Sequence, residues 1–427
     1  MADRIAGKRQ MIQDLPWLIA PTPQERERLA RLGGLECNQL IPALRELIGR
    51  GWNDTELSSI GRRLRKALGS CTRSRDELAQ NAGCIAFSLL VVSSNTVNHL
   101  VDGLCASALR AGILLSCRTV EYQQPESWLA TQREQLAADP PDATLLALDR
   151  TDAQLGQPVL GDAAAAEACV QAALDRVLCI AQQVIATTGR SVILQTIAGQ
   201  ASDAQQSADS WLDGSTRRLL ADFNLRLPIM ARENSCAVFD TAAIANLVGV
   251  TNWNAGRYWY TSKLPFASAC MPLYAHRLVQ LLAAMRGKAR RVLVLDLDNT
   301  LWGGVIGDDG ISGIELGMGS ARGEAFLAVQ RLALQYRARG VILCIASKNS
   351  DEVARQVLRE HPDMLIRESD IAMFQNIQFH TDLRQQAHGL DMIPVHLQEL
   401  AHHLLRRMDL AVSEHARGGH HSRRQAR

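Results

Sequence analysis

Residues 290–304 read Arg-Arg-Val-Leu-Val-Leu-Asp-Leu-Asp-Asn-Thr-Leu-Trp-Gly-Gly, and this run decides how the C-terminal part of the chain folds. Val292 to Leu295 are apolar at every position, which predicts a short strand buried on both faces of a parallel sheet. Asp296 and Asp298 come next, and the alternation of side chains along a strand points both carboxylates to one side. Open parallel sheets bind ligands at the carboxyl ends of their strands. The stretch therefore predicts a site with two carboxylates.

This pair of carboxylates suggests chemistry on phosphate. Two like charges so close repel each other and call for a cation, and a hard Mg²⁺ ion held by carboxylates and by a substrate phosphate suits them. One aspartate could attack phosphorus while the other moves protons. A bare Asp-x-Asp can also be a polar strand end without function. The residues that follow it are therefore needed to choose between these two interpretations.

Those residues carry a family resemblance. Asp296 to Leu301, Asp-Leu-Asp-Asn-Thr-Leu, resembles the first signature of the haloacid-dehalogenase (HAD) phosphotransferases. Residues 302–317, with Trp-Gly-Gly-Val-Ile-Gly-Asp-Asp-Gly and Gly-Ile-Glu-Leu-Gly, are similar to the FkbH-like family, subfamily IIIC of that superfamily. The resemblance is nearly continuous over 291–349, weaker before it, and ends near residue 375. It implies transfer of the glyceryl group of 1,3-bisphosphoglycerate to the phosphopantetheine thiol of an acyl carrier protein, with loss of phosphate, for a polyketide starter or extender unit.

A second strand is predicted over residues 341–346, followed by Ser347-Lys348-Asn349, which resembles the second HAD signature. A hydroxyl and an ammonium at a strand end can hold phosphate oxygens. The resemblance implies Asp296 as phosphoryl nucleophile and Mg²⁺ ligand, and Asp298 as general acid and base whose backbone carbonyl also binds the metal. Ser347 would hold the transferred phosphate, and the further phosphate-binding candidates are Asn299, Thr300 and Lys348.

Acyl transfer would call for a thiol nucleophile. Members of the family often carry Cys directly before Ser-Lys-Asn, but here that position is Ala346. The nearest cysteine is Cys344, two residues earlier on the same face of the strand. We interpret it either as the acyl-accepting thiol or as an ordinary buried strand cysteine.

The first part of the chain predicts an N-terminal helical segment and a second α/β domain. Residues 1–78 indicate helices, with Asp54 as the expected N-cap of a helix over residues 55–68. Residues 82–287 alternate between strands and helices, which predicts a doubly wound sheet. The expected fold class is thus α/β, with two Rossmann-like domains, an SGNH-like one and then a HAD-like one over residues 290–375.

Ser93 and Ser94 follow the first predicted strand, where SGNH-type hydrolases carry a serine nucleophile, and residues 93–96 are expected to cap the next helix. No Gly-Asp-Ser motif and no late Asp-x-x-His accompany them, so we predict the fold without esterase activity. Further along, an aromatic segment over residues 252–266 either lines a cleft between the domains or forms a packing corner.

Composition limits the cellular context. A net charge of +2 gives no basic field for nucleic acid. No apolar run reaches membrane-spanning length, and residues 1–13 lack the apolar region of a signal peptide. The ten cysteines are scattered without a Cys-x-x-Cys pair, so we expect buried or free thiols in a reducing compartment and a cytoplasmic protein.

The tail, residues 376–427, does not continue the resemblance to the HAD superfamily. The superfamily needs a later lysine and a final acidic pair, but no lysine follows Lys348 and no two acidic residues are adjacent there. Eight of the eleven histidines lie beyond residue 376, which marks a change of composition. We expect a shifted frame or a truncation, a partly disordered tail and a sheet left open beside the strand over 292–295. A phosphatase on another small ester and a non-catalytic remnant are the alternative functions.

Overall fold

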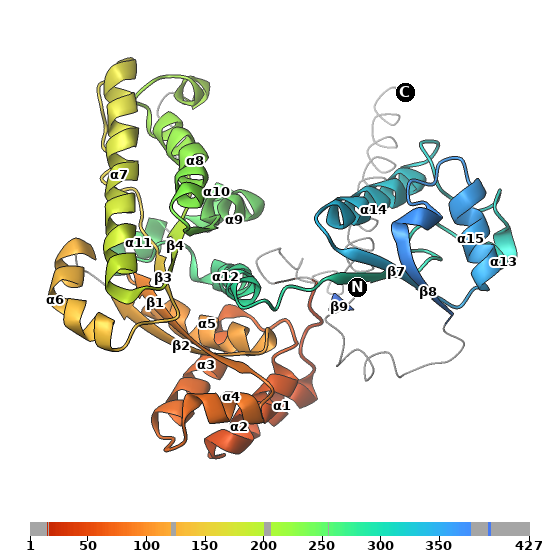
Figure 1. Ribbon diagram of the computed structural model, residues 1–427, viewed down its shortest axis with the longest axis horizontal. Helices are drawn as coiled ribbons and strands as arrows, with labels where there is room; N and C mark the ends of the chain where they lie inside the picture. The colour runs from red at the N-terminus through yellow and green to blue at the C-terminus, as the bar shows by residue number, and fades with distance from the viewer. Residues whose placement is uncertain are drawn as a thin grey trace, which may run out of the picture. The chain divides into compact units, whose positions relative to one another are not determined.

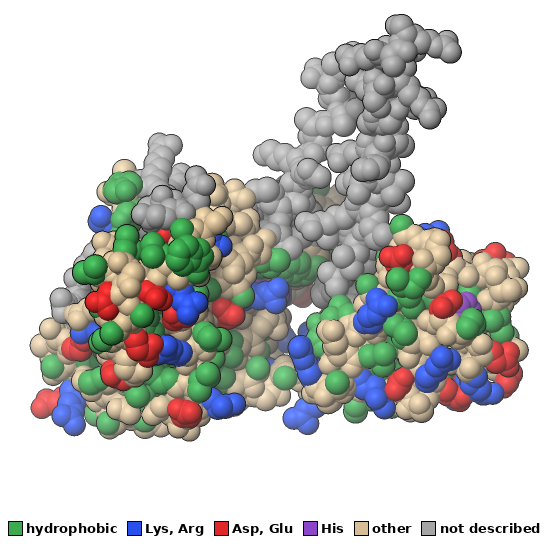
Figure 2. Space-filling model, turned by 90° about the horizontal axis from the view of Figure 1, so that it is seen from above, with side chains coloured by type: hydrophobic (Ala, Val, Ile, Leu, Met, Phe, Trp, Pro, Cys, Tyr) green, Lys and Arg blue, Asp and Glu red, His purple; other side chains and the backbone are tan. Residues whose placement is uncertain are grey.

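The computed structural model describes residues 15, 17–120, 125–199, 206–254, 256–376 and 392–393 (Figure 1). The chain separates into two compact units, Met1–Met285 and Arg286–Arg427. On the face drawn in Figure 2, basic and acidic side chains are interspersed over both units. No helix in the described part of the chain is long and apolar enough to cross a membrane.

The first unit contains a five-stranded sheet with the order β2-β1-β3-β4-β5, and every neighbouring pair is parallel. Parallel neighbours need crossovers, and helices between successive strands supply them. The strand order reverses direction after β1 and β2, which is the doubly wound arrangement that the sequence predicted. The strands are β1 (Ile85–Val92), β2 (Ile113–Val120), β3 (Ala143–Leu146), β4 (Ser191–Gln195) and β5 (Ala237–Phe239).

Side-chain alternation along β1 divides this unit into two cores. Leu89 and Val91 belong to the core shared with α5 (Asn98–Arg110) and α12 (Met271–Met285), whereas Leu90 and Val92 belong to the opposite one. Successive side chains point to opposite faces of a sheet, so a strand with apolar residues on both faces needs helices on both sides. Figure 1 shows α7 and α8 on one side of the sheet and α5 on the other. The second core is closed by α6 (Pro125–Ala138), α7 (Ala163–Thr188) and α8 (Thr216–Glu233).

The N-terminal helices pack into the first of these cores. Trp52 is fully buried, and its indole Nε1 donates a hydrogen bond to the Leu47 carbonyl at 3.0 Å. These helices are therefore part of the first compact unit. The remaining helices of this unit are α1 (Pro23–Arg31), α2 (Cys37–Leu47), α3 (Asp54–Gly69), α4 (Arg75–Asn81), η2 (Gln206–Ser210), α9 (Thr241–Val248), α10 (Val250–Trp253), α11 (Gly256–Ser262) and η3 (Ser268–Cys270).

Two predicted helix caps were wrong. The N-cap of α3 is Asn53 rather than Asp54, because Asn53 Oδ1 accepts the Glu56 N–H at 2.8 Å and Glu56 returns a bond to the Asn53 backbone N–H. Helix α5 begins at Asn98, and its cap position carries no side-chain hydrogen bond. Ser93 Oγ instead accepts the Asn95 N–H at 3.1 Å, which closes a local turn before the helix.

The prediction that all cysteines are buried or free thiols was wrong for one pair. Cys37 and Cys71 form a disulfide between the start of α2 and the end of the α3 region, with Cα atoms 6.5 Å apart. The other eight cysteines are in no disulfide. The two bonded residues are 34 positions apart and belong to no short motif, so only the packing of the two helices brings them together.

The second unit contains a four-stranded parallel sheet with the order β8-β7-β6-β9. Leu293 and Leu295 of β6 pack with Leu343 and Ile345 of β7 in one core, which helices α14 and α15 cover. This is the second α/β unit that the sequence predicted. Its elements are β6 (Val292–Leu295), α13 (Ile306–Asp309), α14 (Ala321–Ala338), β7 (Ile342–Ser347), α15 (Asp351–Glu360), η4 (Glu368–Asp370), β8 (Ile371–Asn376) and β9 (Met392–Ile393).

The prediction of a sheet left open beside β6 was wrong, because β9 pairs with this strand. Met392 pairs with Val292 and Ile393 with Leu293, so the first half of β6 has a parallel neighbour. Beyond these two residues, the predicted tail over 376–427 and the possible helix over 395–408 lie outside the described residues.

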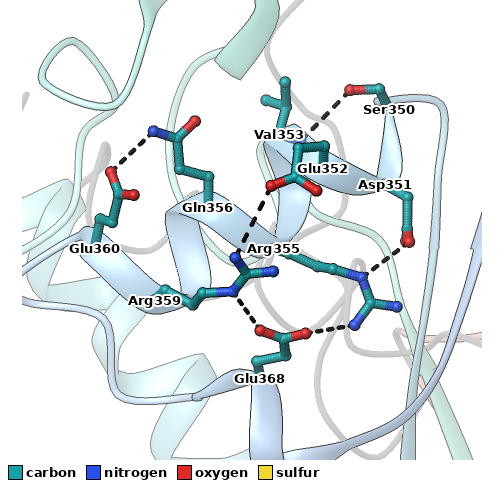
Figure 3. A network of polar contacts seen from close by, with 9 residues as sticks. All are labelled: Ser350, Asp351, Glu352, Val353, Arg355, Gln356, Arg359, Glu360 and Glu368. Atoms are coloured by element: carbon teal, nitrogen blue, oxygen red, sulfur yellow. Dashed lines mark hydrogen bonds and ion pairs between the residues drawn. The ribbon is translucent and has the colours of Figure 1, made fainter.

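Helix α15 is held at its solvent side by an ion network (Figure 3). Arg355 and Arg359 share the carboxylate of Glu368, each with a contact of 2.5 Å. The Arg355 guanidinium also lies 3.9 Å from the centre of the Phe374 ring in β8. Hydrogen bonds from both arginines lower the pKa of Glu368, so its charged form is favoured near neutral pH. The network ties α15 to η4 and β8, and α15 begins directly after the Ser347-Lys348-Asn349 turn.

The contact between α3 and α5 gives a first prediction. A Cβ atom added at Gly61 would lie 1.8 Å from the backbone oxygen of Asp102, whereas one at Gly69 would meet nothing within 4 Å. Because backbone cannot rotate away as a side chain can, we expect Gly61→Ala to lower the free energy of unfolding by at least about 1–3 kcal/mol. Gly69→Ala in the same helix is the matched control and should be neutral or stabilising. Urea unfolding of the two variants measures the difference, and equal midpoints would contradict this packing.

Candidate active site

The parallel pairing of β6 with β7 brings the predicted site residues together. Leu295 lies opposite Ile345, so the chain leaves both strands at nearly the same level. Asp296 and Asp298 follow β6, and Ser347 ends β7. The direct link across the two strands is a hydrogen bond of 2.8 Å from Asn349 Nδ2 to Asp298 Oδ2.

Asp298 is held by three donors. Its Oδ1 accepts the Trp302 indole N–H and the Ile306 backbone N–H, each at 3.1 Å, and its Oδ2 accepts the amide of Asn349. These bonds fold the residues after β6 back over the strand end, and Gly303 and Glu315 pair beside them. The orientation of this carboxylate is thus fixed before any substrate binds.

Asp296 is bonded more sparsely. Its Oδ1 accepts the Leu297 backbone N–H at 2.8 Å, and Oδ2 has no hydrogen-bond donor among the described residues. Burial raises the pKa of Asp296, and the negative charge of Asp298 raises it further, while the Leu297 N–H and the Lys348 ammonium act in the opposite direction. A half-buried carboxylate with a free oxygen and a carboxylate neighbour is stabilised by a bound cation.

The donor set fits Mg²⁺. Mg²⁺ in proteins is commonly held by one or two carboxylates, with water and substrate phosphate completing its octahedron. Asp296 offers a free carboxylate oxygen, and the Asp298 side chain is oriented beside it. No group of three or more His, Cys, Asp or Glu residues that could hold a metal occurs in the described ranges, so a third protein carboxylate is absent from them.

The residues at the end of β7 form a compact turn. Ser347 is 5% exposed, and its Oγ accepts the Asn349 backbone N–H at 3.1 Å. Lys348 is exposed and close enough to Asp296 to lower the pKa of that carboxyl. The predicted hydroxyl and ammonium therefore both lie at the sheet edge with the two aspartates.

Asn299 and Thr300 are placed differently from each other. Asn299 is exposed with a φ of +55°, and its Oδ1 accepts the Gly304 N–H and an Arg322 guanidinium N–H, each at 3.2 Å. The Thr300 hydroxyl is fully buried and has no hydrogen-bond partner in the part of the chain that the structure describes. The structure thus brings Asn299 to the surface near the site and keeps the Thr300 side chain in the interior.

Sequence reasoning missed Trp302, Ile306 and Arg322. Trp302 donates to Asp298 through its indole N–H, and Ile306 donates through its backbone N–H. A backbone donor cannot be predicted from the residue type. Arg322 lies in the first turn of α14, where it contacts Asn299 and pairs with Glu315 at 3.6 Å. A basic residue soon after the Gly-Ile-Glu-Leu-Gly stretch over 313–317 was a signal that could have been used.

Cys344 lies opposite Val294 in the pairing of β6 with β7. Val294 is two residues before Asp296, so the three side chains point to the same side of the sheet. The cysteine is half-buried, and burial raises its pKa. A raised pKa reduces the thiolate fraction at neutral pH, and the thiolate is the nucleophilic form. The geometry puts this thiol near the site but does not activate it.

In the first unit, Ser93 is 1% exposed, and no hydrogen bond joins Ser93 or Ser94 to a histidine among the described residues. Burial lowers the pKa of His99 to about 4, so this nearby ring is neutral. The ring of His276 lies 5.6 Å from that of Trp17. Neither serine thus has a histidine base among the described residues.

With this geometry in view, comparisons with known proteins show a shared fold. No protein-family model matches the chain, and no curated protein matches it in sequence. The N-terminal part of the protein BF1531 from Bacteroides fragilis, which contains a phosphatase domain complexed with Mg, matches with a TM-score of 0.67. The match covers 80% of this chain and 87% of that chain at 20% identity. At this identity the match shows that the architecture is shared, and activity needs other evidence.

Other solved structures match a smaller share of this chain. A putative lipolytic protein of the G-D-S-L family from Desulfitobacterium hafniense covers 46% of this chain and 99% of its own length, at 9% identity and a TM-score of 0.31. A mutant of Axe2, an acetyl-xylooligosaccharide esterase from Geobacillus, covers 45% and 92% respectively, at 13% identity and a TM-score of 0.30. These scores are too low to assign any property to the first unit.

The isolated serines give a prediction. Because neither Ser93 nor Ser94 is bonded to a histidine, a fluorophosphonate probe should leave the chain unlabelled, as judged by intact mass. A serine esterase of known activity is the positive control. Labelling that disappears in Ser93→Ala or Ser94→Ala would contradict the structure.

A further prediction concerns the stability of the second unit. The raised pKa of Asp296 favours the folded state below the ordinary pKa of aspartate, and this contribution is lost as pH rises through the raised value. At pH 7 without metal, Asp296→Asn should therefore melt no lower than the native chain. Millimolar Mg²⁺ should raise the melting temperature of the native chain and not that of the variant.

The matched control is Asp308→Asn, an exposed carboxylate in α13. It should keep the Mg²⁺ response of the native chain. An equal Mg²⁺ shift in Asp296→Asn, measured by scanning calorimetry, would show that the cation binds elsewhere.

Proposed function

We propose that the second unit binds Mg²⁺ and a small phosphate ester at the carboxyl ends of β6 and β7, and that Asp296 accepts the phosphoryl group. The observation that carries the proposal is the contrast between the two aspartates. Asp298 is oriented by three hydrogen bonds, while Asp296 keeps one oxygen without a donor in the described part of the chain. A nucleophile needs a free lone pair, and an acid–base group needs a fixed position.

The proposed reaction has two steps. An Asp296 oxygen attacks phosphorus, the bond from phosphorus to the leaving oxygen breaks, and a proton from Asp298 goes to that oxygen. Asp298, now a carboxylate, then takes a proton from the water that attacks the aspartyl-phosphate, which releases inorganic phosphate and restores Asp296. Ser347 and Lys348, at the end of β7, would bind the oxygens of the transferred group. When bound, Mg²⁺ would neutralise charge on the phosphoryl oxygens and would be held by Asp296 and the backbone carbonyl of Asp298.

The finer proposal names the substrate and the acceptor. The FkbH-like resemblance of residues 291–349 supports 1,3-bisphosphoglycerate as substrate and the phosphopantetheine thiol of an acyl carrier protein as acceptor. In that reaction the two steps at Asp296 would remove the phosphate ester at carbon 3. At carbon 1 a sulfur–carbon bond forms at the carbonyl, the bond from that carbon to its phosphate oxygen breaks with release of phosphate, and the thiol proton passes to a base. The raised pKa of Cys344 favours direct attack by the carrier thiol over an acyl intermediate on this cysteine.

We further propose that turnover by this chain is weak. Phosphoryl transfer depends on positioning and charge neutralisation. No lysine follows Lys348, and the described residues hold two site carboxylates without a third. Each missing charge partner costs on the order of 10²- to 10³-fold in rate, by analogy with a lost oxyanion donor. A binding protein without catalysis is the limiting case of this proposal.

The test is an incubation of residues 1–427 with Mg²⁺, 1,3-bisphosphoglycerate and a phosphopantetheinylated carrier protein. Phosphate release and glyceryl-carrier mass are followed together. We expect slow phosphate release that Asp296→Asn abolishes, while Cys344→Ala keeps it. Release without carrier loading would support a plain phosphatase. Unchanged release in Asp296→Asn would overturn the assignment of the nucleophile, and carrier loading at about 1 per second or faster, an ordinary enzyme rate, would overturn the weak turnover.

A further inference from the structure

A cavity of about 440 Å³ lies in the first unit, at the carboxyl ends of three neighbouring strands. Asp149 and Arg150 follow β3, Gln195 ends β4, and Thr241 follows β5. Ligand sites in parallel α/β sheets occupy this edge, and their volumes commonly run from about 300 to 1,000 Å³. Position and size are therefore those of a small-molecule site.

Aromatic rings form one wall of this cavity. Trp253 and Phe266 stack with ring centres 4.4 Å apart, and both are almost fully buried. Trp259 and Tyr260 continue the wall toward solvent, where Tyr260 is 81% exposed. This is the aromatic segment over 252–266, and the cavity that it lines is formed by residues 148–266. The wall suits a flat or branched apolar group.

Other residues of the lining offer hydrogen-bond donors without acceptors among the described residues. Thr241 is 3% exposed, yet its hydroxyl has no partner. The Tyr274 hydroxyl donates to Gln195 Oε1 at 2.9 Å, and Nε2 of this lining residue has no acceptor in the described part of the chain. Arg150 lines the same space and has no ion-pair partner in the described part of the chain. A buried hydroxyl without a partner is costly, and an acceptor-rich ligand would satisfy it.

The acidic residues near the cavity do not offset its preference for a ligand rich in hydrogen-bond acceptors. Both oxygens of Asp149 are occupied: Oδ1 accepts the Thr151 and Asp152 N–H groups, and Oδ2 accepts the Asn95 amide at 3.1 Å. Asp152 accepts the Asp149 N–H, and burial together with the Asp149 charge raises its pKa. Arg150 is then the charged group in the lining whose hydrogen bonds remain available.

We propose that this cavity binds a small carboxylic acid with an aromatic or branched apolar body. The apolar body would pack on Trp253 and Phe266, and the carboxylate would accept hydrogen bonds from Arg150, Thr241 and Gln195. The site carries no nucleophile–base pair, so its role is binding rather than hydrolysis. It is independent of the phosphoryl site of the second unit.

The experiment uses matched probes with the full chain: 3-phenylpropionate, indole-3-acetate and 4-methylpentanoate, each beside its neutral primary amide. Saturation-transfer NMR and calorimetric titration measure binding. At least one carboxylate should bind, and its amide should bind about ten-fold more weakly, the size expected for a lost charge-assisted hydrogen bond. Arg150→Leu should remove this preference, and Thr241→Val should weaken the carboxylate by about two- to ten-fold.

Three controls keep the result interpretable. Arg133→Leu changes an exposed arginine of α6 and should leave binding unchanged. Asp296→Asn should also leave it unchanged, which separates this site from the proposed phosphoryl site. Thr241→Val removes a buried hydroxyl without a partner and should not lower the melting temperature. Failure of all three carboxylates to bind, equal binding of acids and amides, or an unaltered preference in Arg150→Leu would each overturn the proposal.

Discussion

The parallel register between β6 and β7 is the constraint on which the candidate active site depends. With Leu295 opposite Ile345, the two chains leave the sheet together, and the carboxylates after one strand meet the polar turn after the other. A slip by one residue would turn the alternate side chains to the opposite face. The apolar residues Leu293, Leu295, Leu343 and Ile345 hold the register because they fill one buried core. Core packing therefore determines the geometry of the polar edge.

Unequal hydrogen bonding then gives the two aspartates different properties. Trp302, Ile306 and Asn349 together satisfy Asp298, so its charge is compensated by dipoles that are already in place. Asp296 receives one backbone donor, and burial raises its pKa. The loop that folds back over these two aspartates thus satisfies both oxygens of Asp298 and leaves Asp296 Oδ2 without a donor in the described part of the chain.

The sequence predicted the parts of this structure that follow from periodicity. The apolar run Val292–Leu295 identifies a strand, and β6 has the predicted limits. Its Leu293 and Leu295 are buried, whereas Val292 and Val294 on the other face are half-buried. The position of Asp296 and Ser347 at the carboxyl ends of neighbouring strands follows from the parallel sheet. Choices between neighbouring groups of similar chemistry were not predictable, as the cap at Asn53 instead of Asp54 shows. The disulfide between Cys37 and Cys71 and the backbone donor of Ile306 depend on tertiary packing, which leaves no short pattern in the chain.

The two units show how one architecture acquires different chemistry at the same edge. Both have parallel sheets with polar residues after the strands, but the balance of donors and charges differs. At the ends of β6 and β7, two carboxylates lie together, an arrangement stable with a cation or a proton. At the ends of β3, β4 and β5, the one carboxylate in the lining is already bonded, and donors remain next to aromatic rings. An excess of acceptors selects cations and the phosphates that they bind, whereas an excess of donors selects an anion. The class of ligand therefore depends on which hydrogen-bonding groups remain unpaired at the strand ends rather than on the fold.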